Sequence, residues 1–339
     1  WSTRDNETDW TPSATNTAGS QRIVGGSKIV TAVRTRGQIL VLTDTSAHGM
    51  SFIGAPFVFG FQQLGSNCGA ISPHSAIDVG GVSYWMSSES FFVFDGTVKL
   101  LPSLVEDFVF TTTGSNVGIN YSSNEIIYGS HNSLFNEIVW FYPAGTPSGS
   151  PAVQNNRSVV YNYVENTWAT MTLARSSYAD ASTYDVPYAT EYTSTATPTI
   201  SNLSGATNTF GSSLYFAQEV GINEIALDGT ETAIPAYIQS GDFDLPTEGD
   251  GEYILRLSRF LPDFKNLQGN AIVTIFLKNF PIDGGTSSQL GPFTINSTTQ
   301  KIDTRARGRL ANIKIQNTAV DETWRFGTFR ADVNQDGRR

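Results

Sequence analysis

The sequence consists mainly of short runs rich in β-branched and aromatic residues, separated by Gly, Asn, Asp and Ser. This pattern is typical of strands joined by tight turns, and no segment shows a helical period beyond a turn or two near SLVEDF. The composition agrees, because 31 Gly and 14 Pro favour turns and a hydrophobic content of 39% can supply a core. We therefore predict a folded, all-β protein.

The strand runs of the first two thirds fall into groups of similar size. Residues 29–54 predict three strands with a turn at Arg36-Gly37, residues 76–102 and 124–173 predict four strands each, and residues 213–240 predict a further group. Asp95, Asn162 and Asp228 follow similar runs and are separated by 67 and 66 residues, which indicates a repeat. Four strands in under about 30 residues is the size of a propeller blade. The predicted domain is β-propeller-like and spans residues 29–240, preceded by residues 1–28 as an N-terminal arm or the end of a missing upstream element.

The strands of residues 241–339 are longer and more regular. Ala271, Val273, Ile275 and Leu277 would share one face of a strand, while Thr274 would lie on the other. Such alternation is typical of antiparallel strands that are buried on one side. We predict that residues 241–339 form a smaller antiparallel β-sandwich or barrel.

Charge is distributed unevenly along the chain. The net charge is −10, yet residues 301–339 hold nine basic and five acidic residues. In one regular strand, Arg305, Arg307 and Arg309 would share a face with apolar Ile313, so either a bulge at Gly308 turns them away or that face meets a partner. Three partners stay open: acidic residues of the same domain, a neighbouring subunit and DNA phosphates. The three arginines are our candidate intersubunit contact.

Catalytic and metal-binding motifs are missing from the sequence. The three histidines, His48, His74 and His131, lack partners at metal-ligand spacing, and there is no phosphate-binding loop or nucleophile elbow. The single cysteine, Cys68, is expected to be a buried apolar residue. The segment DVNQDG (332–337) matches only the first half of a calcium loop. We expect no catalytic residue, no metal and no cofactor, and no run of residues is apolar enough to span a membrane.

Two further groups of residues have both a structural and a functional interpretation. The acids Glu89, Asp95, Glu125 and Glu137 could form a glycosidase pair but stand near turns, where exposed charges are ordinary. Aromatic runs could form a carbohydrate platform, although alternating aromatics in strands more often belong to the core. These runs are Phe57, Phe59 and Phe61; Phe91, Phe92 and Phe94; and Trp140, Phe141 and Tyr142.

Several longer stretches carry a family resemblance. The segment from Arg34 to Pro102, together with NEIVWFYP, RSVVYNYVENTW, FLPDF and the ending KIDTRARGR…WRFGTFRADVNQDGRR, resembles virion structural proteins of tailed bacteriophages. Within these, the chain is most similar to the packaged-DNA stabilisation or tail-nozzle proteins of short-tailed phages. The resemblance covers about residues 29–339 and assigns no catalytic residue. Family members are usually longer, which suggests that an N-terminal portion is absent.

The resemblance implies a non-enzymatic subunit of the tail nozzle or head-tail connector. Such subunits would form a hexameric ring in the virion, contact adjacent tail and adaptor proteins, and let packaged DNA pass without specific binding during ejection. The protein would be assembled in the host bacterial cytoplasm. One alternative is a receptor-binding tail-fibre or baseplate-type subunit that recognises host surface glycans, and another is a glycan-cleaving propeller enzyme.

Overall fold

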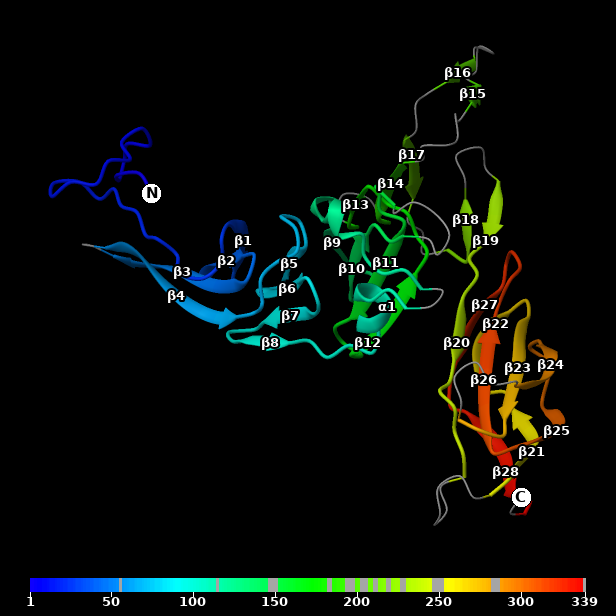
Figure 1. Cartoon of the computed structure of the whole chain (residues 1–339). Coiled ribbons are helices and arrows are strands. Elements are labelled where there is room, and N and C mark those ends of the chain that lie inside the picture. Colours follow the sequence, from blue (N-terminus) through cyan, green and yellow to red (C-terminus); the bar gives the residue numbers. More distant parts are fainter. Residues whose placement is uncertain are drawn as a thin grey trace. The chain divides into compact units, whose positions relative to one another are not determined.

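The computed structural model describes residues 1–54, 57–113, 116–145, 152–181, 185–192, 199–201, 207–209, 213–217, 221–225, 230–245, 253–281 and 287–337. The fold is all-β, as predicted (Figure 1). The chain divides into two compact units, Trp1–Gln218 and Glu219–Arg339.

Three four-stranded antiparallel sheets make up most of the first unit, and in each the strands pair in chain order. The first sheet contains β1 (Ile29–Thr35), β2 (Gln38–Thr43), β3 (Ser46–Gly54) and β4 (Val58–Ser66). The second contains β5 (Ala76–Val79), β6 (Val82–Met86), β7 (Phe91–Phe94) and β8 (Val98–Leu100). The third contains β9 (Tyr128–Asn132), β10 (Glu137–Tyr142), β11 (Arg157–Asn162) and β12 (Thr167–Met171). This succession of blade-like sheets is the predicted propeller-like repeat.

The predicted repeat positions are equivalent in two of the sheets. Asp95 lies between β7 and β8, and Asn162 ends β11 just before the turn to β12, so both mark the connection from third to fourth strand. Asp228 lies outside the described residues. Two short helices, α1 (Glu106–Phe110) near the expected SLVEDF turn and the 3-10 segment η1 (Tyr121–Ile126), connect the second sheet to the third.

Apolar side chains fill the spaces between successive sheets. One core joins the first and second sheets and contains Leu40, Leu42, Cys68, Trp85 and Phe94, so Cys68 is buried as expected. A larger core joins the second and third sheets. Its buried members are Ile71, Met86, Phe91, Leu101, Val109, Ile119, Ile127, Ile138, Trp140, Tyr142, Ala144, Val159 and Tyr161. Burial on both faces explains why these strands are nearly continuous apolar runs.

The fourth predicted group of strands is not a fourth blade. β17 (Ser213–Ala217) pairs with β14 (Tyr188–Tyr192), which also pairs with β13 (Ser177–Ala179). β18 (Asn223–Ile225) pairs with β19 (Glu231–Ala233), and β15 (Thr199–Ser201) with β16 (Thr207–Thr209). These strands have similar runs but different partners, because run length does not specify which edge a strand joins.

The second unit is a sandwich of two antiparallel sheets. One sheet has the order β20 (Tyr237–Gln239), β26 (Leu310–Gln316), β23 (Ala271–Lys278) and β24 (Ser288–Ile295). The other has the order β25 (Ile302–Gly308), β21 (Leu255–Leu261) and β28 (Arg330–Gln335), and β22 (Phe264–Gln268) pairs with β27 (Thr323–Phe326). As predicted, Ala271, Val273, Ile275 and Leu277 are buried in the core between the sheets.

The boundary between the units differs from the one expected at residue 240. β20 pairs with β26, so the strand that the sequence places at the end of the first domain belongs to the sandwich. Among the described residues, no helix is long and apolar enough to cross a membrane.

Candidate functional site

The three predicted contact arginines do not lie on one strand. Arg305 and Arg307 are exposed residues of β25, whose buried positions include Ala306, while Arg309 connects β25 to β26. β26 buries odd-numbered residues such as Ile313, so the alternation changes phase between Gly308 and Leu310. A Cβ at Gly308 would lie 3.2 Å from the Leu277 Cβ, and the chain passes from one sheet to the other here. Arg305 and Arg307 thereby lie on the outside of the three-stranded sheet, and Arg309 lies beyond its end.

Ion pairs within the unit cover part of this arginine surface. Arg307 Nε lies 2.8 Å from an Asp336 carboxylate oxygen. Arg259 lies 3.0 Å from Asp303 and 3.5 Å from Asp332. Hydrogen bonding to Asp303 raises the pKa of Arg259. Of the three partners left open by the sequence, an acid of the same domain is observed for Arg307, and the intersubunit contact stays a prediction.

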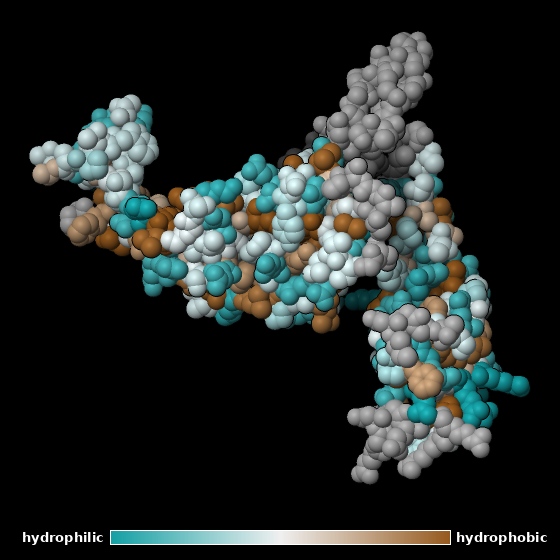
Figure 2. Space-filling view, in the orientation of Figure 1, coloured by the Kyte–Doolittle hydropathy of each residue, from teal (hydrophilic) through white to brown (hydrophobic). Residues whose placement is uncertain are grey.

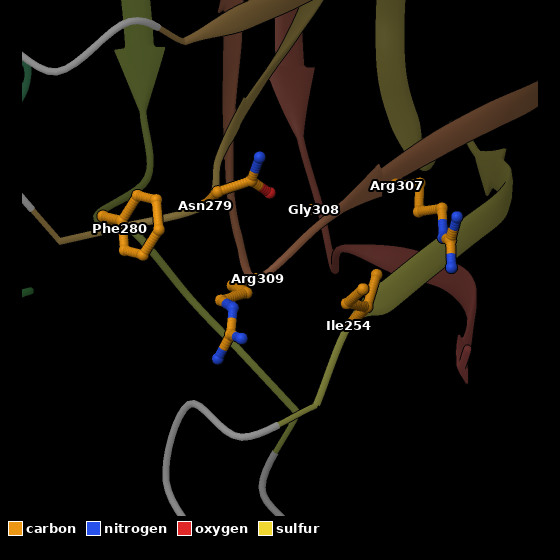
Figure 3. A pocket seen from close by; sticks show the side chains of 6 residues that line it. All are labelled: Ile254, Asn279, Phe280, Arg307, Gly308 and Arg309. Atoms are coloured by element: carbon orange, nitrogen blue, oxygen red, sulfur yellow. The ribbon is translucent and has the colours of Figure 1, made fainter. Parts of the chain in front are cut away.

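A shallow pocket of about 370 Å³ lies beside these arginines (Figure 3). It is lined by Ile254, Asn279, Phe280, Arg307, Gly308 and Arg309. Figure 3 shows the Arg307 and Arg309 side chains apart from each other, with Ile254 between them in this view, so the pocket does not gather two guanidinium groups around one point.

The carboxylates of the segment that resembles half a calcium loop (332–337) form ion pairs with arginines. Asp332 belongs to β28 and contacts Arg259, and Asp336 contacts Arg307. Within the described ranges, no group of three or more His, Cys, Asp or Glu side chains could hold a metal ion.

The histidines and candidate acids are dispersed, with one exception that the sequence did not reveal. His131 Nδ1 lies 3.1 Å from an Asp180 oxygen, and its Nε2 lies 3.2 Å from the Tyr163 hydroxyl. Burial raises the pKa of Tyr163, and the Asp180 charge adds to this, so the phenol stays protonated. Asp180 follows β13, 49 positions beyond His131, and no local sequence motif predicts that the two residues make contact. The network ties β9 and β11 to residues near β13.

The candidate acids have no common site. Asp95 pairs with Lys99 at 2.6 Å, and hydrogen bonding to that lysine lowers the Asp95 pKa. Glu137 begins β10, where burial raises its pKa. Glu89 follows β6, and Glu125 lies in η1. Glu89 and Asp95 lie in turns between strands, as interpreted, whereas Glu125 lies in η1 and Glu137 is a half-buried strand residue.

The aromatic runs separate into core and surface. Phe91, Phe94, Trp140, Phe141 and Tyr142 are buried, as expected for core strands. Phe57 is 70% exposed, so the first run departs from that expectation.

The candidate site is the outer face of the four-stranded sheet in the second unit. β26 buries Ala311, Ile313 and Ile315, so its alternate residues point outward. Pairing register places Tyr237 of β20 beside Gln316, and Gln239 beside Lys314. Since residues opposite each other share a face, the outer surface is formed mainly by amide, hydroxyl and aromatic side chains. The side chains on this face that are at least partly accessible are Tyr237, Gln239, Ile272, Phe276, Gln289, Thr294, Asn312, Lys314 and Gln316. Thr274 has the same orientation but is buried.

Contacts across the strands hold this surface in place. The Gln239 amide donates to Asn312 Oδ1 at 2.8 Å. The Lys314 ammonium lies 4.6 Å from the centre of the Tyr237 ring, and the Tyr237 residue is still 67% exposed. At the edge, Lys278 pairs with Asp242 at 2.8 Å. The surface therefore offers an exposed ring beside positioned amides and has little uncompensated charge.

Comparison with protein families and with curated proteins finds no match to this sequence. Among solved structures, similar chains include a glycoside hydrolase with 10% identity and a TM-score of 0.25, over 85% of this chain and 81% of that one. Another is an exo-β-1,3-galactanase from Phanerochaete chrysosporium with β-1,3-galactotriose, with 10% identity and a TM-score of 0.26, over 90% of this chain and 79% of that one.

These comparisons contradict the expected function. The similar structures are glycan-cleaving enzymes, so the expectation of a tail-nozzle subunit, and with it that of a non-enzymatic protein, is wrong by this comparison. TM-scores of 0.25 to 0.27 are too low to transfer a substrate or a catalytic residue to this chain. The resemblance to phage virion proteins, the hexameric ring and the virion location stay predictions.

Proposed function

We propose that this protein binds neutral glycans through the outer face of the β20-β26-β23-β24 sheet. The observation that carries the proposal is the exposed Tyr237 ring beside the outward amides of Gln239, Asn312 and Gln316. It needs no assumption about the distant enzymes described above.

The chemistry of a sugar matches this surface in two ways. A pyranose ring presents an apolar C–H face, which an exposed aromatic ring can cover. Its hydroxyls both donate and accept hydrogen bonds, and a carboxamide carries a donor and an acceptor in one group. The Gln239–Asn312 hydrogen bond orients two of these amides before any ligand arrives, which lowers the entropic cost of binding.

Charge on the surface favours a neutral ligand over an acidic one. Lys278 is neutralised by Asp242, and the ammonium of Lys314 is held against the Tyr237 ring. The opposite outer face of the same sandwich, formed by β25, β21 and β28, is rich in arginine and aspartate. An acidic polymer would favour that arginine-rich face. Binding of a neutral glycan to the outer face of the β20-β26-β23-β24 sheet involves no such ion pairs, so it should depend only weakly on salt concentration.

The test is affinity electrophoresis followed by calorimetry with neutral galactose-, glucose- and mannose-based polysaccharides. We expect Tyr237→Ala and Gln316→Ala each to weaken binding about tenfold, the loss of roughly one good contact. The matched control is Asn334→Ala, an exposed polar residue on the opposite outer face. Absence of binding to every neutral polysaccharide, or equal binding by Tyr237→Ala, would contradict the proposal.

A further inference from the structure

The β3–β4 hairpin extends beyond the sheet to which it belongs (Figure 1). β2 pairs with β3 only from Ala47 to Met50, whereas β3 and β4 stay paired out to Gly54 and Val58. The distal part of the hairpin is thus a two-stranded ribbon with no third strand. Such ribbons are marginally stable in water by themselves.

This distal ribbon carries apolar side chains on both of its faces. Phe52 is 74% exposed and Ile53 is 57% exposed. Consecutive strand residues point to opposite faces, so neither face is covered. Phe57, at the turn, is 70% exposed. Figure 2 shows apolar surface over this hairpin at the left of the view.

The base of the ribbon has a different environment. Phe59 lies opposite Phe52, with ring centres 6.0 Å apart, and the Trp1 ring packs on Phe59 at 5.4 Å and on Phe61 at 6.4 Å. The aromatic contacts therefore fix the direction of the hairpin near the sheet, while Phe52, Ile53 and Phe57 stay more than half exposed.

The hairpin also lacks polar side chains altogether near its tip. Residues 52–61 read FIGAPFVFGF, in which no side chain can form a hydrogen bond, and no Asp, Glu, Lys or Arg occurs between Asp44 and Asp78. Protein interfaces carry roughly one hydrogen bond per 100–200 Å² and a polar rim. This segment has neither feature.

From these observations we infer that the tip of the β3–β4 hairpin inserts into the interfacial region of a lipid bilayer. A folded partner would cover one face of the ribbon, whereas lipid surrounds it and covers both. The backbone groups that face between β3 and β4 are paired, whereas the two outer edges beyond Met50 have no neighbouring strand, so the tip can enter the hydrated interfacial region but not the hydrocarbon core. Four residues beyond Met50 extend about 13 Å at ~3.3 Å per residue, which is enough for the ~5–10 Å depth of interfacial elements.

The absence of charge defines the kind of membrane surface. Basic segments select anionic lipids and are released by salt, but this hairpin has no basic residue to do so. We therefore expect binding to zwitterionic bilayers, independent of ionic strength. This interaction is separate from glycan binding, because it uses the first unit alone.

Flotation of the full chain with phosphatidylcholine vesicles through a density gradient tests the inference. The wild type should float at low and high salt. The double variant Phe52→Ser, Phe57→Ser should stay at the bottom, and its ratio of vesicle-bound to free protein should be at least tenfold lower than that of the wild type. Leu104→Ser is the matched control, because Leu104 is fully exposed outside the hairpin. Circular dichroism should show that all three proteins are folded.

Three results with phosphatidylcholine vesicles, and one with anionic vesicles, would overturn the inference. In the first, the wild type would fail to float. In the second, the double variant would float as well as the wild type. In the third, Leu104→Ser would reduce flotation as strongly as the double variant does. Sedimentation velocity identifies the occupant in the first case, because loss of concentration-dependent self-association in the double variant would assign the hairpin to a second copy of the chain. Flotation confined to anionic vesicles at low salt would likewise exclude the proposed apolar mode.

Discussion

The first and third sheets of the first unit each contain a strand rich in aromatic residues, with opposite outcomes. In β10, Trp140 packs on Phe91 at 5.0 Å on one side, and Phe141 packs on Tyr128 at 5.0 Å on the other. In the β3–β4 hairpin, Phe52 is largely exposed. Both segments are apolar β-runs of similar composition. The difference lies in their neighbours, since β10 has a strand on each edge and apolar side chains against each face.

Aromatic content therefore does not specify burial in this molecule, and the position of the strand within its sheet does. A residue beyond the last paired neighbour strand has no core to enter, however apolar it is. The comparison predicts that truncating an aromatic residue to alanine has a large effect on stability in water in β10 and almost none in the hairpin.

The largest effect is expected for Trp140→Ala. The indole is fully buried and its N–H donates to the Ser75 carbonyl at 2.8 Å. Removing it leaves a cavity and takes one hydrogen bond from the Ser75 carbonyl, which keeps only the longer one from the Met86 N–H at 3.4 Å. We therefore expect the free energy of unfolding to fall by about 3–5 kcal/mol. Denaturant unfolding followed by circular dichroism measures the change.

The matched control is Phe57→Ala in the hairpin. Because this ring is mostly in water already, its loss should change the free energy of unfolding by less than about 0.5 kcal/mol. A loss above 1 kcal/mol from Phe57→Ala would mean that the ring is covered in solution, and it would remove the contrast between the two segments.

Two glycines sharpen the comparison: Gly129 of β9, which lies opposite Trp140, and Gly54 of the hairpin. A Cβ at Gly129 would lie 3.1 Å from the Trp140 indole nitrogen, whereas a Cβ at Gly54 would meet nothing within 4 Å. Gly129→Ala must displace the ring and should cost about 1–3 kcal/mol. Gly54 has a φ of 83°, so Gly54→Ala pays only for the left-handed backbone, about 1 kcal/mol.

Thermal and denaturant unfolding of both glycine variants would decide between packing and backbone conformation. If Gly54→Ala is the more damaging of the two, backbone conformation rather than packing dominates, and the tip of the hairpin is more constrained than its exposure indicates.

The sequence predicts the local elements of the fold well and their partners less well. The turn at Arg36-Gly37 and the alternation around Val273 lie where the sequence places them, because both are set by neighbouring residues. The pairing of β20 with β26 joins residues that are far apart in the sequence, and no local pattern specifies it. This is why the predicted boundary falls beyond β20 rather than before it.

The same reasoning applies to the candidate sites. Arg305 and Arg307 could be selected from the sequence because charge is visible there. The pairing of Arg307 with Asp336 depends on long-range strand pairing, and the separation of both arginines from Arg309 depends on the change of sheet at Gly308. The platform around Tyr237 could not be found, because its amides come from separate strands and are ordinary residues individually. Register alone brings them together.

The smallest predicted effect concerns the buried base of β3, the strand whose end is exposed. His48 is 4% exposed, and one of its ring nitrogens lies 2.9 Å from the Ser46 hydroxyl. Burial lowers the pKa of His48 below its usual value of 6.5. Below pH 6.5 the unfolded chain therefore binds a proton at His48 that the folded chain does not bind. The free energy of unfolding should fall as pH decreases from 6.5 towards the lower folded pKa.

Thermal melting between about pH 7 and pH 5 should show this dependence of stability on pH, above the range in which carboxylates ordinarily titrate. His48→Gln should flatten it, while His74→Gln, at an exposed position, should keep the wild-type slope. An unchanged slope in His48→Gln would mean that water reaches the base of β3, and the contrast within this one strand would be lost.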